Sequence, residues 1–138
     1  MKHPFKYEEF TSKIIGAAMT VHRELGTGFQ ERIYQRALSI EFAAASLAHK
    51  REFSMPIRYR DQHIGSRRVD FLVEEVISVE IKAVTKLEPV HLAQAINYLE
   101  AYHLEVGLLI NFGAESLEFK RLCNKKHKPQ SDKSHQSA

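Results

Sequence analysis

The sequence predicts a mixed α/β (α+β) domain in which a mixed β-sheet is flanked by helices. Residues 6–25 place apolar side chains at helical spacing and end at Gly26. Short apolar runs of strand length follow between residues 52 and 83. Pro89 fits the first turn of a further helix, and residues 106–112 form a continuous apolar run typical of a buried central strand. The expected element order is therefore α-α-β-β-β-α-β-β.

The second helix is expected to open in a capping box at residues 27–30 and to continue to about Leu47. Its apolar face would consist of Phe29, Ile33, Ala37, Ile40 and Ala44. Glu31 falls in the first turn of this helix, where the positive end of the helix dipole stabilises an acidic side chain. From its position alone, that electrostatic role is the preferred interpretation of Glu31.

Three other segments complete the expected sheet. Residues 52–59 predict a strand, residues 61–65 a turn, and residues 117–122 an edge-like final strand. Asn111 stands at the end of the buried run, where a polar side chain more often satisfies backbone groups than binds a ligand.

The third helix should run from Pro89 to about Tyr102 and cover the sheet with Ala95, Leu99 and Tyr102. Another of its faces carries three polar side chains, His91, Gln94 and Tyr98. Such a cluster marks either a binding edge or a solvent-exposed edge. Spacing alone favours the solvent-exposed edge.

Charged side chains interrupt the two apolar runs at residues 69–73 and 77–83. Asp70 lies in the first run, and Glu80 and Lys82 lie in the second, although an ionised group in a half-buried strand costs several kcal/mol unless it is paired. Matched apolar faces predict a hairpin with the pairs Val73–Ile77, Phe71–Val79 and Val69–Ile81. The same register places Asp70 opposite Glu80, with Cβ atoms roughly 5 Å apart, and leaves residues 74–76 as the loop.

Two facing carboxylates repel each other unless a cation lies between them or one of them takes up a proton. Mg²⁺ or Mn²⁺ suits such an oxygen-rich site, and Lys82 projects from the same face as Glu80, where it could orient an attacking water. The alternative is a surface hairpin in which the two acids form salt bridges with Lys82 or Arg68. Glu118 and Lys120 repeat the Glu-x-Lys spacing without a facing strand acid, so they predict a solvated edge.

Composition narrows the remaining possibilities. A chain of 138 residues is long enough for one domain, here residues 1–123. Residues 124–138 form a basic polar tail that is expected to be disordered, and they carry all of the net charge of +3. We find no signal peptide and no membrane-spanning run, and a single cysteine, Cys123, favours a reducing cytoplasm. The eight histidines lack the spacing of a zinc site.

Five ordered motifs resemble the GxxExxY proteins, a family placed in the PD-(D/E)XK nuclease superfamily. They are Gly26–Tyr34, Asp70–Val73, Glu80–Val84, His91–Leu99 and Gly107–Gly113. The resemblance extends from about Tyr7 to Leu122. It implies a PD-(D/E)XK nuclease-like core. One departure is that Val69 precedes Asp70, where the superfamily name has a proline.

The resemblance also implies a role for each matching residue. Gly28, Glu31 and Tyr34 match the naming motif, and Glu31 would lie at the edge of the metal site. Asp70 and Glu80 match the metal-binding acids, the backbone carbonyl of Ile81 would be a third ligand, and Lys82 matches the catalytic lysine. Gln94 and Tyr98 match a Gln-x-x-x-Tyr pattern that lies beside the active site in one branch of the superfamily.

Two functions follow from these observations. The first is a phosphodiesterase that depends on Mg²⁺ or Mn²⁺ and acts on nucleic acid, with DNA as the expected substrate. Asp70 and Glu80 would hold the cation that activates water, and Lys82 would assist. The second is a non-catalytic module that keeps the nuclease fold and binds nucleic acid or protein. A second subunit would help a domain of this size to span a duplex, but no residue supports a homodimer directly.

Overall fold

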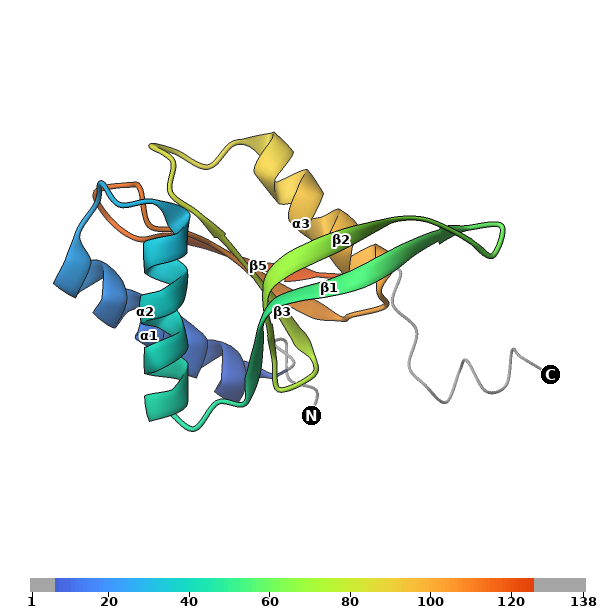
Figure 1. Ribbon diagram of the computed structural model, residues 1–138. Coiled ribbons are helices and arrows are strands. Elements are labelled where there is room, and N and C mark those ends of the chain that lie inside the picture. The colour runs from blue at the N-terminus through green and yellow to red at the C-terminus, as the bar shows by residue number, and fades with distance from the viewer. Residues whose placement is uncertain (1–6, 126–138) are drawn as a thin grey trace.

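The computed structural model describes residues 7–125, which form one five-stranded mixed sheet with helices on both faces (Figure 1). The elements are α1 (Glu8–Leu25), α2 (Glu31–Ala44), β1 (His49–Tyr59), β2 (Gln62–Val73), β3 (Ile77–Lys82), α3 (Pro89–Ala101), β4 (Val106–Asn111) and β5 (Glu118–Cys123). The predicted order of elements is confirmed. Most of the predicted basic tail lies outside the described residues. Among the described helices, none is long and apolar enough to cross a membrane.

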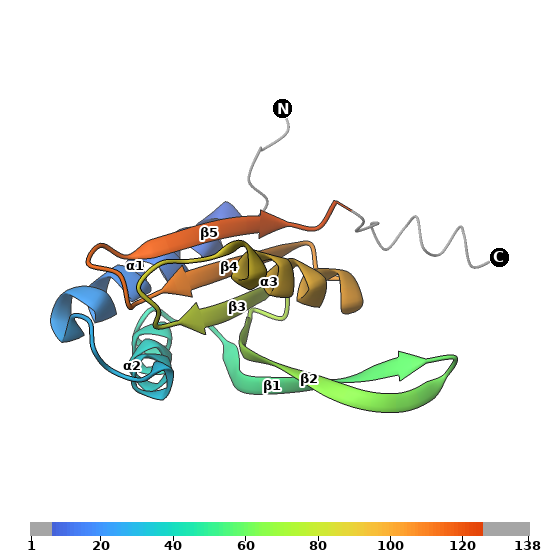
Figure 2. The ribbon, with the colours of Figure 1, turned by 90° about the horizontal axis from the view of Figure 1, so that it is seen from above.

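The strands are arranged in the order β1-β2-β3-β4-β5. Only β3 and β4 pair in parallel, and α3 connects them, because a parallel pair needs a crossover connection. Figure 2 shows α3 on one face of the sheet and α1 and α2 on the other. The acidic strand β3 is therefore the middle strand of the sheet, and the surface hairpin considered from the sequence is excluded.

The larger core lies between the sheet and the pair α1 and α2, and the smaller core lies under α3. Alternation along β4 serves both cores, because Leu108 and Ile110 face the first and Leu109 faces the second. Stacked rings anchor the larger core: Tyr34 lies over Phe112 with centroids 4.7 Å apart. Every residue of β4 is buried, as expected for an interior strand.

The predicted start and apolar face of α2 are wrong. The helix begins at Glu31 without a side-chain cap and ends at Ala44. Its buried residues are Tyr34, Gln35, Leu38 and Phe42, whereas Phe29, Ile33 and Ile40 are 47%, 39% and 70% exposed. The helix carries two apolar stripes, and the stripe with the aromatic rings is buried because rings bury more area and find ring partners in the sheet.

The predicted turn at residues 61–65 is also wrong, because β2 begins at Gln62 and continues through Gly65. The chain reverses at Arg60 and Asp61, which both have positive φ angles (50° and 62°), as a two-residue hairpin turn requires. The register shifts by one residue between Ile57 and Arg58. Gly65, the glycine that suggested a turn, therefore belongs to the β1–β2 ladder, where it pairs with Ile57.

The ends of β3 and β4 are tied together by Asn111. Its side-chain oxygen accepts from the N–H groups of Val84 (2.9 Å) and Gly113 (3.0 Å), and its amide donates to the carbonyl of Val84 and to Glu118. The expected backbone role of Asn111 is thereby confirmed. This tie fixes the segment that directly follows Lys82.

Gly113 should not tolerate a side chain, because a Cβ atom there would overlap the backbone of Ala83 and Val84. We expect Gly113→Ala to lower the free energy of unfolding by about 2–3 kcal/mol, as overpacking does. Gly16→Ala, which meets open space within α1, should raise it by about 0.5–1 kcal/mol. Urea denaturation of both glycine variants measures these changes. Equal effects would contradict the close approach of Gly113 to the backbone of Ala83 and Val84.

Candidate active site

Asp70 is held by two hydrogen bonds at the gap between β2 and β3. Its Oδ2 accepts from the backbone N–H of Ile81 at 2.7 Å, and its Oδ1 accepts from Gln35 Nε2 at 3.0 Å. Burial raises the pKa of Asp70, while these two hydrogen bonds and the positive charge of Lys82 oppose the rise. The carboxylate is therefore fixed in place, and each oxygen keeps a second lone pair.

The hairpin register is only partly as predicted. The pairs Val73–Ile77 and Phe71–Val79 form, and residues 74–76 are the loop. The ladder ends there, so the pairs Val69–Ile81 and Asp70–Glu80 are absent from it. The physical reason is that the Asp70 carboxylate takes the N–H of Ile81, which a carbonyl of β2 would otherwise accept. Beyond this point the two strands separate.

Glu80 is a mostly buried acid with an incompletely satisfied carboxylate. Its side chain is 15% exposed, and its Oε2 has no hydrogen-bond partner. Arg67 Nη2 lies 3.8 Å from this oxygen, within ion-pair range but beyond hydrogen-bond reach. Burial, followed by the charge of Asp70, raises the pKa of Glu80 to about 7, although Arg67 and Lys82 oppose the rise. The charge of Asp70 therefore acts on Glu80.

Lys82 and Glu31 lie around this acidic pair. Burial has the largest effect on the pKa values of Asp70 and Glu80 and raises both of them. The charge of Lys82 opposes this rise at both carboxyl groups. Glu31 is the exposed first residue of α2, and its charge makes a smaller contribution to the raised pKa of Glu80. No group of three acidic, histidine or cysteine side chains within residues 7–125 is arranged as a metal site. Glu31 therefore lies at the periphery of the Asp70–Glu80 pair.

The polar residues of α3 divide into three environments. Tyr98 is fully buried, and its hydroxyl has no hydrogen-bond partner. Burial raises the pKa of Tyr98 above its usual range, and the charge of Glu80 adds to the rise, so these two side chains are neighbours. The side chain of Gln94 is exposed, and His91 Nδ1 accepts the N–H of Glu88 in a capping box. The prediction of a solvent-exposed edge is therefore wrong for Tyr98.

Arg67 and Gln35 also belong to this site, although the sequence patterns did not predict them. Arg67 donates to the carbonyl of Gln94 (2.8 Å) and to Asn97 Oδ1 (3.0 Å), and its guanidinium lies 5.7 Å from the centroid of the Tyr98 ring. Gln35 is only 5% exposed, although it is polar and lies on a helix. The available signal for Gln35 was its position between Tyr34 and Leu38, four residues after Glu31.

Two residues of the predicted naming motif shape a loop at the start of α2. The hydroxyl of Tyr34 donates to the carbonyl of Gly26 at 2.6 Å and accepts from the N–H of Phe29 at 3.3 Å. Gly28 has φ of 106°, a conformation that favours glycine. Because Tyr34 forms hydrogen bonds to this loop and Gly28 supplies its backbone conformation, we interpret both residues as structural.

The oxygen atoms of this site fit a divalent cation. Glu80 Oε2 is a buried acceptor without a donor, and Asp70 lies beside it. The carbonyl of Ile81 lies on the same edge of β3 as its N–H, and that N–H points to Asp70. Hard cations such as Mg²⁺ bind oxygen ligands of this kind.

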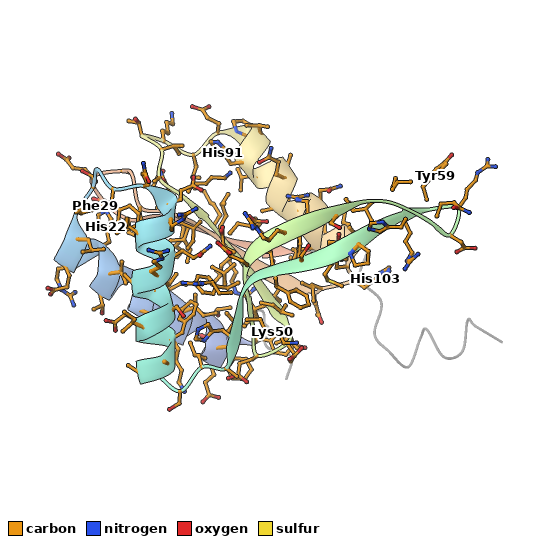
Figure 3. All side chains as sticks on the ribbon, in the orientation of Figure 1. His22, Phe29, Lys50, Tyr59, His91 and His103 are labelled. Atoms are coloured by element: carbon orange, nitrogen blue, oxygen red, sulfur yellow. The ribbon has the colours of Figure 1, made fainter. Side chains whose placement is uncertain are left out.

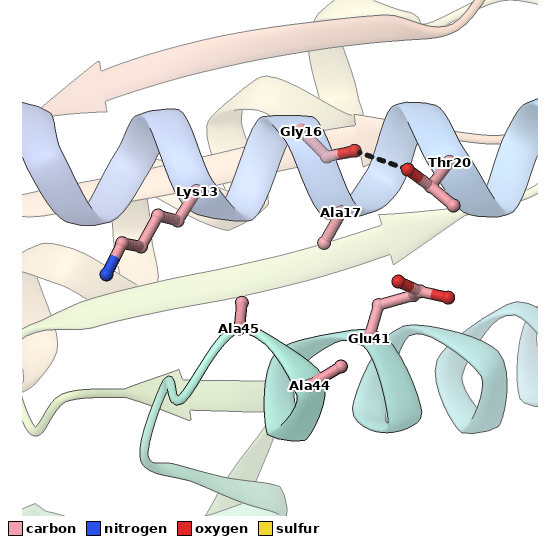
Figure 4. A pocket seen from close by; sticks show the side chains of 7 residues that line it. All are labelled: Lys13, Gly16, Ala17, Thr20, Glu41, Ala44 and Ala45. Carbon is pink, nitrogen blue, oxygen red and sulfur yellow. Dashed lines mark hydrogen bonds between the residues drawn. The ribbon is translucent and has the colours of Figure 1, made fainter.

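A separate groove between α1 and α2 has different chemistry (Figure 4). Its volume is about 330 Å³, and it is lined by Lys13, Gly16, Ala17, Thr20, Glu41, Ala44 and Ala45. None of the predicted site residues lines it. Its small side chains and single opposite charges offer no arrangement for catalysis.

The pH dependence of stability tests the environment of Glu80. A glutamate ionises near pH 4.5 when unfolded, but folded Glu80 keeps its proton to about pH 7. Stability should therefore fall as pH rises from about 4.5 to 7, because the unfolded state then binds fewer protons. Without metal, Glu80→Gln should be more stable than the wild type by about 2 kcal/mol at pH 8, and the two should converge near pH 4.

Urea denaturation across this pH range measures the difference. Glu75→Gln is the matched control, because its side chain is 69% exposed and the solvent screens its charge. A stability profile of Glu80→Gln that runs parallel to the wild type would contradict the burial described for Glu80.

The loop role of Tyr34 is tested by Tyr34→Phe. The change removes two hydrogen bonds and leaves the ring stack, so we expect a loss of about 1–2 kcal/mol in the free energy of unfolding. Tyr59→Phe, at a side chain that is 62% exposed, should cost almost nothing. Equal stability of Tyr34→Phe and the wild type would show that the loop does not depend on this hydroxyl.

Comparisons with known proteins agree with the fold. A family model described as the PD-(D/E)XK nuclease superfamily matches residues 8–122. The crystal structure of SSO0001 is similar, with a TM-score of 0.54 and 14% identity over 96% of this chain, and the chain spans 66% of that structure's length. At this identity the likeness concerns the fold alone. No curated protein matches the sequence. Because the family model covers most of its length, the chain belongs to the PD-(D/E)XK nuclease superfamily.

Proposed function

We propose that this protein is a nuclease that requires a divalent cation, Mg²⁺ or Mn²⁺, and hydrolyses phosphodiester bonds in DNA. One observation carries the proposal. Glu80 Oε2 is a buried acceptor without a hydrogen-bond donor, and it lies beside the fixed carboxylate of Asp70. Membership in the superfamily gives independent support, since nucleases of this class generally use divalent metals.

Asp70, Glu80 and the carbonyl of Ile81 would hold the cation, with Glu31 nearby on α2. A divalent cation at such a site supplies positive charge that lowers the pKa of water and neutralises phosphate oxygens. The donor set consists only of oxygen atoms, as Mg²⁺ and Mn²⁺ prefer. The hydrogen bonds from Gln35 and Ile81 fix Asp70 in advance, so little ordering is needed on binding.

The protonation state of Glu80 would govern this site. Because its pKa is about 7, the carboxyl group loses a proton when it becomes a ligand. Cation affinity should therefore rise with pH up to about 7 and then level off. Burial makes Glu80 a poor anion in the empty site and a good partner for a doubly charged ion.

Lys82 would act on the phosphate. It extends from β3 two residues beyond Glu80, and its charge acts on both acids. From this position its ammonium group can orient the attacking water and stabilise the negative charge that develops on the phosphate oxygens. Arg67 instead donates to the backbone of α3 and holds the buried Tyr98 against the sheet, so we assign it a positioning role.

Cation binding and catalysis can be separated by three substitutions. Asp70→Asn and Glu80→Gln should weaken the binding of Mn²⁺ by at least about tenfold in isothermal titration. Lys82→Ala should keep this affinity and lower the rate of DNA cleavage by at least about 100-fold. Single-stranded, duplex and branched DNA are the substrates to compare.

Lys120→Ala is the matched control, because Lys120 has the same Glu-x-Lys spacing on the exposed strand β5. Glu118, the acid of this second Glu-x-Lys pattern, accepts hydrogen bonds from the Asn111 side chain and from the N–H of Leu87. These hydrogen bonds lower the pKa of Glu118 and indicate a structural role. Cation binding without cleavage of any substrate, with DNA affinity unchanged in Lys82→Ala, would replace the nuclease by the non-catalytic binding module.

A further inference from the structure

A two-stranded arm projects from the sheet. It comprises residues 50–68, and we call it the β1–β2 arm. Figures 1 and 2 show it extending past the other strands, away from the three helices. At the base of the arm, Lys50 and Arg51 pair with Leu72 and Phe71, which also belong to the β2–β3 ladder. The β2–β3 ladder ends at Phe71, so beyond this point the two strands of the arm pair with each other and contact α3 near the base. One such contact joins the Tyr102 hydroxyl to the carbonyl of Met55 at 3.0 Å.

The outer half of the arm contributes nothing to the hydrophobic core. Every residue from 56 to 64 is exposed. Tyr59 and Ile64 are each 62% exposed, and Figure 3 shows Tyr59 far from the body of the protein. An isolated two-stranded hairpin is only marginally stable in water, so the arm adds little to the stability of the fold.

The arm concentrates positive charge. Residues 50–68 contain six lysine or arginine residues and two acidic residues, for a net charge of +4. The rest of the described chain contains nine basic and fourteen acidic residues, for a net charge of −5. The basic residues of the arm are Lys50, Arg51, Arg58, Arg60, Arg67 and Arg68. The near-neutral total charge therefore conceals two regions of opposite sign.

The charges at the tip of the arm are not neutralised within the described part of the chain. Lys50 and Arg68 pair with exposed acids, and Arg67 lies near Glu80. Arg58 and Arg60 have no carboxylate within ion-pair distance among residues 7–125. The guanidinium of Arg60 lies over the Tyr59 ring at 5.7 Å.

We infer that the β1–β2 arm binds the phosphate backbone of duplex DNA and guides it to Asp70 and Glu80, an inference that rests on the proposed function. A two-stranded ribbon fits the major groove, which is about 12 Å wide. The seven residues that separate His63 from Asp70 span about 23 Å along β2. That length corresponds to about seven base pairs.

Protection of the sheet edge does not explain this charge pattern. Charged residues and Pro56 on β1 do discourage pairing with another strand. That protection works with charge of either sign, whereas the arm is strongly positive. Positive charge beside an acidic catalytic pair is what a polyanionic substrate requires.

Binding of a fluorescent duplex of about 20 base pairs, measured by anisotropy in EDTA, tests the arm without cleavage. The variant Arg58→Ala/Arg60→Ala should lose at least about tenfold in affinity near 100 mM salt. The slope of log K against log salt should become shallower by about 1.8, because two phosphate contacts are lost. The matched control is Lys13→Ala/Arg23→Ala, which removes two exposed charges from α1 and should change affinity less than about twofold.

Unchanged affinity and salt dependence in the arm variant would overturn the inference, and so would equal losses in the arm and control variants. A dimer in sedimentation that dissociates in the arm variant, with DNA affinity unchanged, would assign the arm to a second copy of the chain instead. Circular dichroism melting should give the same Tm for both double variants and the wild type, because all four positions are exposed.

The two proposals can fail separately. If the wild type binds DNA through the arm but cuts no substrate with Mg²⁺ or Mn²⁺, the nuclease proposal fails and the arm inference stands. If Lys82→Ala abolishes cleavage while Arg58→Ala/Arg60→Ala binds and cuts as the wild type does, the arm inference fails and the nuclease proposal stands.

Discussion

The hydrogen bond from the N–H of Ile81 to the carboxylate of Asp70 is the contact on which the site depends. It satisfies a backbone donor of the central strand with a side chain, so β2 can leave β3 without an unpaired buried N–H group. Two consequences follow because the Asp70 carboxylate, and not a backbone carbonyl of β2, accepts this N–H group. The acid is fixed beside Glu80, and β2 is released to form the arm with β1.

The fold tolerates the free-energy cost of burying Glu80 because apolar packing stabilises the sheet around it. Glu80 lies in the middle strand, next to the fully buried strand β4, and Arg67 relieves only part of its charge. Apolar packing on both faces, including the stacks of Tyr34 on Phe112 and Phe42 on Phe71, offsets a penalty of a few kcal/mol. A buried acid without a full set of partners is difficult to explain by stability alone, and it favours a role in binding.

The sequence was sufficient to predict the order of elements and the proximity of Asp70 and Glu80, because charge within an apolar strand is a local anomaly. It was insufficient for α2, where two apolar stripes compete and only the ring partners in the sheet decide between them. Gln35 and Arg67 could not be assigned for a related reason. Their partners, Asp70 and the backbone of Gln94, are distant in sequence, and no periodicity reports such contacts.

The distribution of charge in space was likewise not predictable from the order of residues along the chain. Counting along the sequence assigned the positive charge to the tail and gave a neutral body, but the hairpin fold separates that body into a basic arm and an acidic remainder. An acidic remainder repels a polyanion, and two carboxylates at the site add to this repulsion. A nuclease with such a site needs positive charge both at the reacting phosphate and along the approach to it. A divalent cation would meet the first need, and the arm, which begins two residues before Asp70, is placed to meet the second.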